Sequence, residues 1–450
     1  MHFTPVILGG LVTLAGLSAQ HKPNVLILLA DDLGVDYIAC YKEGSNPAKT
    51  PHIDGLAARG VLFRNAWANP LCSPTRSCLM TGRYGFRTGV GHLVGGGRGR
   101  GRRGGGDTGA PLGKELTLPK FLDAAKSSYA HALVGKWHLG GGDRGPNDAG
   151  WSHFAGLLRG ALGRSSYSNW SRTVNGETAQ STKYATTQHV DDALEFIRAS
   201  EKKQKPWFCM VTFIAPHSPF HQPPDDLHTG DVNAMEGRDT VARYRAMVEA
   251  LDMEVGRLLK QLGPGLARTN VIFMGDNGTP RGVVRPPFRD GDAKGTIYEG
   301  GVNVPLIVAG PVVKGDPRES AALVGAVDMY SSVAELCGVD VAKDYPEDRK
   351  LDSRSFVPHL KSADHAPVRT TVFTEIFRGD YNRAGFAAIR DERFKLIRVF
   401  RGDAKPRDRM FDLNEDPFEV RNLLRRTPPD EITARHAKLA AELDRLRGSN

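Results

Sequence analysis

Short apolar runs, rich in β-branched residues, punctuate the first three quarters of the chain, and each has the length of a buried strand. They occupy residues 24–30, 131–135, 207–215, 270–275 and 304–310. Between them, apolar residues recur every three or four positions, as in helices that pack on one face. These helices are predicted at residues 117–127, 187–202, 240–262 and 328–337, with Gly338 as the C-terminal cap of the last. Strands that alternate with helices predict an α/β fold in which helices sandwich a large mixed, mostly parallel sheet.

The pattern changes after residue 345. Strand candidates follow one another closely at residues 371–377, 386–390 and 394–400, and a polar helix is predicted at residues 428–447. Close spacing favours antiparallel pairing, so we expect a smaller C-terminal α+β domain with an antiparallel sheet over residues 346–450. The preceding residues 20–345 are expected to form the large N-terminal domain.

The first 19 residues are typical of a secretory signal peptide. An apolar run over residues 6–17 is followed by Ser18 and Ala19, small residues of the kind found at a cleavage site. A buried N-terminal strand is the alternative. No other apolar segment approaches the ~20 residues that a membrane helix requires. We therefore expect a secreted or periplasmic protein with no integral membrane segment, from which residues 1–19 are removed.

Composition and charge narrow the class of protein. A chain of 450 residues with 40% hydrophobic residues can bury a large core, which excludes a disordered or fibrous protein. Five cysteines are too few for a disulfide scaffold in a chain of this length. The net charge of +9 suits an anionic substrate, although the basic residues are spread along the chain.

One basic cluster stands out at residues 95–106, which read GGGRGRGRRGGG. Its composition resembles a flexible RNA-binding tract, but it lies between two motif-bearing segments of a folded domain. We expect a mobile surface loop that touches a polyanionic substrate, and no nucleic-acid partner. A solvated loop without a role is the alternative.

Two predicted strands end in residues that could bind a metal ion. Asp31 and Asp32 directly follow the first strand, and Asp276 and Asn277 follow the strand at residues 270–275. Open α/β sheets build their sites at the carboxyl ends of such strands. Four hard, partly anionic oxygen donors suit Ca²⁺ or Mg²⁺ better than zinc, because no thiolate or paired histidines accompany them. The alternative is that one acid of a pair caps a helix and the other is solvated.

The most specific segment, residues 71–77, reads Leu-Cys-Ser-Pro-Thr-Arg-Ser, and residues 79–84 continue it as Leu-Met-Thr-Gly-Arg-Tyr. It resembles the signature of the sulfatase family, in which the cysteine of Cys-x-Pro-x-Arg is oxidised to formylglycine during export. Further segments match the family in the same order, at residues 24–34, 134–140, 215–219, 275–278, 294–301, 410–417 and 422–423. Chance would not supply all of them in this order, so the resemblance covers nearly the whole mature chain.

The resemblance implies an alkaline phosphatase-like fold and a sulfuric ester hydrolase that acts on a sulfated glycan or a sulfated small molecule. Cys72 would be converted to formylglycine (3-oxoalanine) by a formylglycine-generating enzyme during maturation. Its hydrated aldehyde would attack sulfur and form a covalent sulfated intermediate, which expels sulfate as the aldehyde re-forms. The implied metal ligands are Asp31, Asp32, Cys72 in its modified form, Asp276 and Asn277, with Ca²⁺ preferred to Mg²⁺.

The family pattern also implies roles for basic residues around the nucleophile. Arg76, Lys136 and Lys294 would offset the charge of the sulfate group. His138 would handle the proton of the nucleophile, while His217 and Lys294 would donate a proton to the departing alcohol.

Two positions depart from the family pattern. Thr75 stands where serine is usual, which keeps a hydroxyl group beside the cysteine motif. Asn303 stands where many relatives have arginine. Either this change alters substrate contacts or the position has a structural role.

Two other functions remain open at this point. A phosphodiesterase or phosphonate hydrolase of the same superfamily would be indicated by a second metal ion. A non-catalytic binder of sulfated polysaccharide would not need the cysteine motif. The residues named above recognise only the sulfate end of a substrate, so the sequence does not select the alcohol.

Overall fold

The computed structural model describes residues 22–95, 112–230 and 239–448. The predicted signal peptide and residues 96–106 of the Gly/Arg-rich segment lie outside these ranges. Within the described ranges, no helix is both long and apolar enough to cross a membrane.

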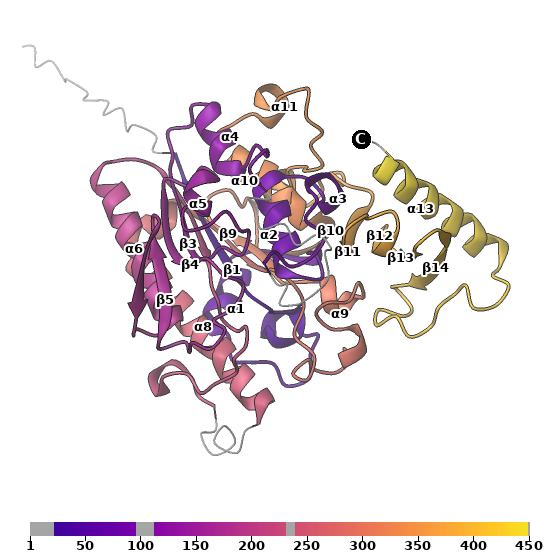
Figure 1. The fold of residues 1–450 in the computed structure, drawn as a ribbon, viewed down its shortest axis with the longest axis horizontal. Coiled ribbons are helices and arrows are strands. Elements are labelled where there is room, and N and C mark those ends of the chain that lie inside the picture. Colours follow the sequence, from indigo (N-terminus) through magenta and orange to yellow (C-terminus); the bar gives the residue numbers. More distant parts are fainter. Residues whose placement is uncertain (1–21, 96–111, 231–238, 449–450) are drawn as a thin grey trace, which may run out of the picture.

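A ten-stranded mixed sheet forms the centre of the molecule (Figure 1). Its strands, in spatial order, are β10 (Arg318–Gly325), β2 (Gly60–Trp67), β9 (Leu306–Ala309), β8 (Thr269–Gly275), β1 (Asn24–Ala30), β7 (Trp207–Thr212), β3 (Ala130–Lys136), β4 (His153–Leu157), β5 (Trp170–Val174) and β6 (Glu177–Ser181). The central strands from β8 to β4 are parallel to one another. β9 is antiparallel to both its neighbours, and β5 and β6 form an antiparallel hairpin at the edge. The predicted large, mostly parallel sheet is therefore confirmed.

Helices cover both faces of this sheet (Figure 1). One face is covered by α1 (Pro51–Ala57), α6 (Ala185–Lys202) and α8 (Thr240–Gln261). The other face is covered by α2 (Cys72–Thr81), α4 (Leu118–Ala124), α10 (Met329–Leu336) and α12 (Val357–Lys361). Short helical turns complete this part: α3 (Gly85–Thr88), α5 (Gly145–Asp148), α9 (Glu299–Val302), α11 (Val341–Asp344), and the 3-10 turns η1 (Val35–Tyr37), η2 (Ala39–Tyr41), η3 (Asp225–Leu227), η4 (Gly263–Arg268), η5 (Asp290–Asp292) and η6 (Ala326–Asp328).

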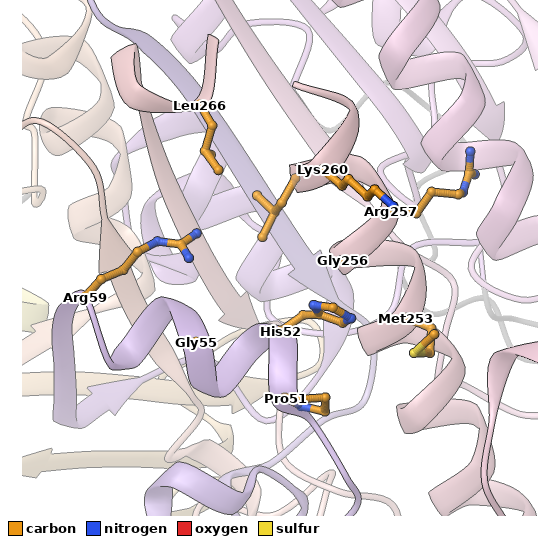
Figure 2. Close-up of a pocket in the computed structure, with 10 residues that line it drawn as sticks. Pro51, His52, Gly55, Arg59, Met253, Gly256, Arg257, Lys260 and Leu266 are labelled. Carbon is orange, nitrogen blue, oxygen red and sulfur yellow. The ribbon is translucent and has the colours of Figure 1, made fainter. Parts of the chain in front are cut away.

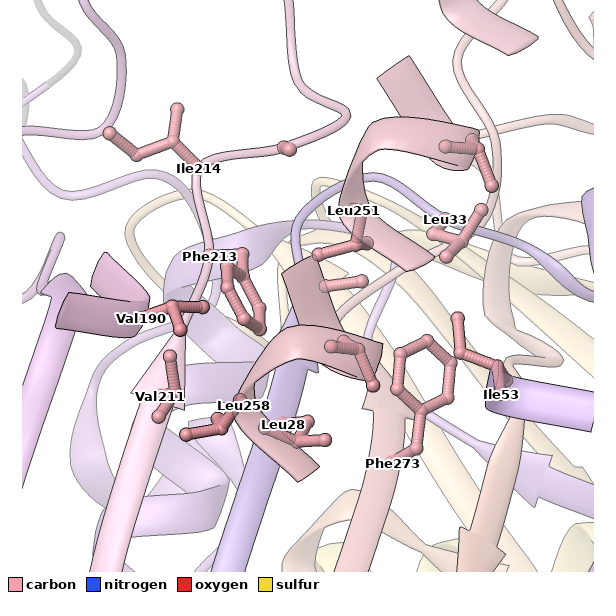
Figure 3. Close-up of a cluster of buried hydrophobic side chains, with 14 of the residues drawn as sticks. Leu28, Leu33, Ile53, Val190, Val211, Phe213, Ile214, Leu251, Leu258 and Phe273 are labelled. Atoms are coloured by element: carbon pink, nitrogen blue, oxygen red, sulfur yellow. The ribbon is translucent and has the colours of Figure 1, made fainter. Parts of the chain in front are cut away.

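Alternate side chains of β1 contribute to two hydrophobic cores. Leu28 lies in the core beneath α8, where Figure 3 shows it near Phe273 and Leu258. Ile27 lies in the core on the opposite face, because successive side chains of a strand point to opposite sides of a sheet. Each fully buried side chain of this size contributes about 1.5–3 kcal/mol through burial. Packing on both faces therefore fixes the position at which this strand ends.

A four-stranded antiparallel sheet follows, as the sequence predicts. Its strands are β11 (Val372–Phe377), β12 (Ala384–Arg390), β13 (Phe394–Arg401) and β14 (Ala404–Asp412), and α13 (Asp430–Gly448) packs on it. One buried cluster joins this sheet to the large one and includes Trp67, Val302, Ile397 and Phe411. The small sheet is thus packed against the end of β2 and the segment that precedes β9.

The sequence pattern missed β2, although this strand leads into the cysteine motif. Arg64 and Asn65 interrupt its apolar run, and in the structure both side chains bond to the neighbouring strand β10. Arg64 Nε lies 2.9 Å from Glu319 Oε2, and Asn65 Nδ2 lies 2.7 Å from the carbonyl oxygen of Ala321. Arg64 and Asn65 form hydrogen bonds with the edge strand β10, so polar side chains are tolerated in β2. They interrupt the continuous apolar pattern by which a buried strand is predicted.

A buried carboxyl group on α8 anchors α1. Asp252 accepts hydrogen bonds from the backbone N–H groups of His52 (3.1 Å) and Ile53 (2.8 Å). Burial raises the pKa of Asp252 to about 7, and the two backbone hydrogen bonds only partly oppose this shift. The folded protein therefore holds this proton more tightly than the unfolded chain does. The contribution to stability is complete below about pH 4 and is lost as the pH rises to about 7.

We expect Asp252→Asn to flatten the pH dependence of stability. Between about pH 4 and pH 8, the free energy of unfolding should fall further in the unchanged protein than in the variant. The difference between the two decreases should be on the order of 2 kcal/mol. Urea unfolding at several pH values measures both slopes. Equal slopes for the two proteins would show that Asp252 titrates alike in the folded and unfolded states.

Candidate metal and catalytic centre

Adjacent strand ends place three carboxylates together. β1 and β8 are paired in parallel, with Ala30 opposite Gly275, so the residues that follow emerge at the same edge of the sheet. The backbone N–H of Asp32 donates to Asp276 Oδ1 at 3.0 Å. Asp32 adopts a left-handed backbone with φ of 68°, which non-glycine residues seldom do. The two strand ends are thus tied to each other directly as well as through the sheet.

The side chain of Cys72 faces these carboxylates from the N-terminus of α2. Ligand atoms of Asp31, Asp32, Cys72 and Asp276 all lie within 4.8 Å of one another, and all four residues are buried. Two oxygens here, Asp31 Oδ1 and Asn277 Oδ1, are buried and have no hydrogen-bond partner. Unsatisfied oxygens among clustered acids are costly unless a cation joins them. The oxygen atoms of Asp31, Asp32, Asp276 and Asn277 therefore fit a hard divalent cation such as Ca²⁺ or Mg²⁺, and Cys72 would join them as an oxygen ligand only in its modified form.

Two buried cations neutralise part of this charge. Lys136 Nζ donates to Asp31 Oδ2 at 2.5 Å. Arg76 Nε and Nη2 donate to Asp276 Oδ2 at 3.1 and 2.9 Å, and its Nη1 donates to the Lys136 carbonyl at 2.6 Å. Burial and the nearby Asp31 raise the pKa of Asp276 to about 7, although Arg76 opposes the shift. A bound divalent cation would add positive charge to this site and favour an anionic ester.

Lys294 and His217 lie on one side of the cluster, both near Asp32. Lys294 Nζ forms an ion pair with Asp32 Oδ1, and His217 Nε2 lies 3.7 Å from Asp32 Oδ2. Burial alone would lower the pKa of Lys294, but the Asp32 carboxylate more than offsets it and raises that pKa, so the ammonium stays charged. Burial lowers the pKa of His217 to about 4 despite the nearby carboxylate. Lys294 is therefore the protonated member of this pair at neutral pH.

His138 lies just beyond the end of β3 and is held mainly through its backbone. Its N–H donates to the Leu158 carbonyl at 3.1 Å, and its carbonyl accepts from Ser73 Oγ at 3.0 Å. Its Nδ1 is buried without a hydrogen-bond partner. Burial, followed by the charges of Lys136 and Arg76, lowers its pKa well below the usual value. The ring is therefore neutral at neutral pH, with an unpaired Nδ1.

Gly160 packs against the His138 ring so closely that a side chain does not fit. A Cβ atom at this position would lie 2.1 Å from His138 Nε2. We expect Gly160→Ala to displace the ring and lower kcat by roughly 10- to 100-fold, because small misplacements of a catalytic group are costly. Steady-state kinetics beside thermal unfolding measure the effect. Gly55→Ala on α1, where a Cβ would meet no atom within 4 Å, is the matched control. Unchanged kcat in the Gly160 variant would contradict a role for the ring.

The two departures from the family pattern have different surroundings. The Thr75 hydroxyl accepts a hydrogen bond from the Asn69 backbone N–H at 2.9 Å, which closes the turn that leads into α2. Threonine supplies this contact as serine would. Asn303 follows α9, and its backbone forms a bridge with Trp67. Its position is therefore tied to the backbone of β2.

Other contacts at the site carried no signal in the sequence. The hydroxyl of Tyr244, on α8, donates to the carbonyl oxygen of Asp32 at 2.5 Å and supports its unusual backbone conformation. Thr212, at the end of β7, donates to the Lys136 carbonyl at 2.8 Å. Neither residue belongs to a motif, and only the packing of distant elements brings them to the site.

A groove of about 560 Å³ lies elsewhere, between α1 and α8, and Figure 2 shows residues that line it. Arg59 and Leu266 are among them, and they precede β2 and β8, which run in the same direction. The groove therefore lies toward the amino ends of these strands. It shares no lining residue with the acidic cluster at their carboxyl ends.

Fold and site together place the chain among the alkaline phosphatase-like hydrolases. The profile of the sulfatase family matches residues 23–339, and the profile described as N-sulphoglucosamine sulphohydrolase, C-terminal, matches residues 292–448. The chain belongs to the sulfatase family, whose members hydrolyse sulfate esters.

Relatives and solved structures agree with this assignment. The chain is 30% identical over 387 residues to N-acetylgalactosamine-6-sulfatase of Sus scrofa, and 27% identical over 437 residues to steryl-sulfatase of Mus musculus. Each match covers 76% of this chain and 66% of the relative, so the chain spans just under two thirds of their length. The crystal structure of Ps i-CgsB matches with a TM-score of 0.77 and 25% identity, over 95% of this chain and 93% of that one. The structure of BT4656 in complex with D-glucosamine-2-N,6-O-disulfate shares the fold, with a TM-score of 0.71 and 21% identity over 95% and 99% of the two chains.

Proposed function

We propose that the protein hydrolyses a sulfate ester, with residue 72 as the nucleophile after oxidation of Cys72 to formylglycine. The observation that carries this proposal is the position of the Cys72 side chain, buried among the carboxylates of Asp31, Asp32 and Asp276. Formylglycine, when hydrated, supplies a hydroxyl nucleophile for sulfur and a second hydroxyl whose ionisation releases sulfate. A Ca²⁺ ion, when held by Asp31, Asp32, Asp276 and Asn277, supplies Lewis acidity toward the sulfate oxygens.

The surrounding residues have distinct tasks in this reaction. Lys136 and Arg76 are fixed by the carboxylates and present positive charge toward an anionic ester. The neutral ring of His138 accepts a proton from the nucleophile. Lys294, kept charged by Asp32, donates a proton to the departing alcohol, and His217 lies on the same side of the site.

A sulfated carbohydrate is the proposed substrate class. Support comes from the name of one relative, N-acetylgalactosamine-6-sulfatase, and from the net charge of +9, which suits a polyanionic glycan. We also propose export, with residues 1–19 removed, and maturation by a formylglycine-generating enzyme. Cys72 is only 1% exposed in the folded chain, so that enzyme would have to act before folding is complete.

The candidate metal ligands favour a sulfatase over a two-metal phosphodiesterase. Among the described residues, one group of histidine, cysteine, aspartate and glutamate side chains is arranged to hold a metal, and it is the cluster around Cys72. The complete set of charged and proton-transferring groups around it favours catalysis over simple binding of a sulfated polymer.

Turnover assays on paired esters test the proposed function. We expect the purified, matured protein to hydrolyse 4-nitrophenyl sulfate and a sulfated sugar, and to act on 4-nitrophenyl phosphate and its diester at least about 100-fold more slowly. Faster cleavage of the phosphodiester would favour the phosphodiesterase. Binding of a sulfated polymer without turnover of any ester would favour the binder.

A further inference from the structure

A buried charge cluster joins the small sheet to the segments that flank the site. Lys395, on β13, is fully buried, and its Nζ lies 3.0 Å from Glu299 Oε1 and 2.9 Å from Glu419 Oε1. The second oxygen of Glu419 accepts the backbone N–H of Glu299 at 2.5 Å. Arg390 Nη1 lies 3.8 Å from Glu299 Oε2 as well. One ammonium group, one guanidinium group and two carboxyl groups thus share a buried interface, and of the two cations only Lys395 contacts both carboxyl groups.

Each flanking segment leads directly to a residue of the candidate site. Glu299 begins α9, five residues after Lys294. Its Oε2 accepts from Trp67 Nε1 at 3.3 Å, and Lys395 Nζ lies 4.7 Å from the centre of the Trp67 ring. Trp67 ends β2, five residues before Cys72. The cluster therefore contacts the chain five residues after Lys294 and five residues before Cys72.

The two segments are also bonded to each other beside the cluster. The N–H of Gly295 donates to the Pro70 carbonyl at 2.9 Å, and the N–H of Ala68 donates to the Val302 carbonyl at 2.8 Å. A shift of α9 relative to the end of β2 would strain both bonds. The separation of Lys294 from residue 72 follows from this packing.

Burying charged residues in such an interface costs desolvation free energy. An apolar replacement of a whole buried ion pair is often neutral or stabilising, so a gain in stability alone does not explain why charged residues stand at this interface. The directional bonds of Glu299 and Glu419 specify one arrangement of α9, whereas apolar packing tolerates several. Glu419 is 4% exposed, and its burial raises the pKa of its carboxyl group to about 7 although Lys395 opposes the shift.

We propose that Lys395 is a positioning residue for the reaction, which holds α9 against Trp67 and thereby sets Lys294 at its working distance from residue 72. The proposal rests on the role given to Lys294 in the proposed function. Lys395 itself is buried beneath α9 in contact with Glu299, Glu419 and Trp67, so it acts through these residues.

The test compares Lys395→Met with Lys294→Ala on a series of substituted phenyl sulfates. Poor leaving groups need the proton from Lys294 more than good ones do. Both variants should therefore lose at least about 10-fold more kcat/KM on phenyl sulfate than on 4-nitrophenyl sulfate. The double variant should be no worse than Lys294→Ala alone. The positioning role would be overturned if Lys395→Met lost the same kcat/KM on every ester of the series. It would also be overturned if the loss in the double variant equalled the product of the two single losses.

Arg369→Met is the matched control. Arg369 is also buried, and it bridges the segment before β11 to Asp328. Its loss should destabilise the protein without changing the dependence on the leaving group. Glu419→Gln is a milder variant that keeps an acceptor for the Glu299 N–H, and it replaces Lys395→Met if that variant fails to fold. It should change the dependence of kcat/KM on the leaving group in the same direction as Lys395→Met. An unchanged dependence in Glu419→Gln would then overturn the proposal.

Hydrogen exchange makes the test independent of turnover. We expect Lys395→Met to speed amide exchange in residues 65–76 and 292–303 together by about 10-fold or more, and Arg369→Met to leave both segments unchanged. Unchanged exchange in these segments of Lys395→Met would refute the positioning role even if the protein proved inactive on every sulfate ester. Absence of turnover in the unchanged protein would instead count against the proposed function alone.

Discussion

Replacing Cys72 with alanine is expected to lower turnover of 4-nitrophenyl sulfate by at least about 10⁴-fold, because alanine has no thiol group that can be oxidised to the aldehyde. The change removes one small buried atom, so stability should fall by only about 1 kcal/mol. Product absorbance measures the turnover, and thermal unfolding reports the fold.

Cys78→Ala is the matched control for this experiment. Cys78 lies on the same helix, is equally buried, and its Sγ accepts from Asn69 Nδ2 at 3.3 Å. The five cysteines all lie in the described ranges and are free thiols, so neither change breaks a disulfide. Turnover within a few fold of normal in Cys72→Ala, with the control also active, would place the nucleophile elsewhere.

Removal of the metal ion is expected to abolish turnover and to lower the melting temperature. Without a cation, the clustered carboxylates of Asp31, Asp32 and Asp276 repel one another in a buried site. Calcium at about 100 times its dissociation constant should stabilise the folded protein by about 2.7 kcal/mol. Thermal unfolding after prolonged chelation, followed by titration with Ca²⁺ and then with Mg²⁺, measures this effect and the preference between the ions.

Asp31→Asn supplies the control for chelation. This variant keeps the shape of the side chain but removes one negative charge from the ligand set, so its melting temperature should respond less to Ca²⁺. Asp340→Asn changes an exposed N-cap of α11 and should leave the response intact. A protein that keeps its turnover and melting temperature after chelation would have no catalytic ion at this cluster.

The sequence predicted the strands whose burial is complete. β1 and β8 are buried at every residue, and helices on both faces leave no place for a polar side chain in their runs. The hairpin of β5 and β6 was missed because it lies at the sheet edge, where β6 is exposed at four of its five residues. β14 was missed for the same reason, since its first half is exposed and rich in charge. Apolar periodicity does not mark a strand that is exposed over most of its length.

The geometry of the candidate site was predictable in part. Asp31 and Asp276 follow parallel neighbouring strands, and the carboxyl ends of such strands meet at one edge, so their proximity follows from the order of elements. The approach of Cys72 to them was implied by its motif alone. The contact of Gly160 with His138 and the pairing of Lys395 with Glu299 carry no local signal, because each joins segments whose packing is decided by the whole core. The roles of these residues in a reaction remain predictions.

The central claim is that residue 72 is converted to an aldehyde, and the most direct test is the mass of the tryptic peptide that spans residues 65–76. The protein would be purified from its own host, or produced together with a formylglycine-generating enzyme. We predict that the thiol is replaced by an aldehyde that reacts with hydrazide reagents. An unmodified thiol at Cys72, under conditions in which another sulfatase is fully converted, would contradict the proposed mechanism.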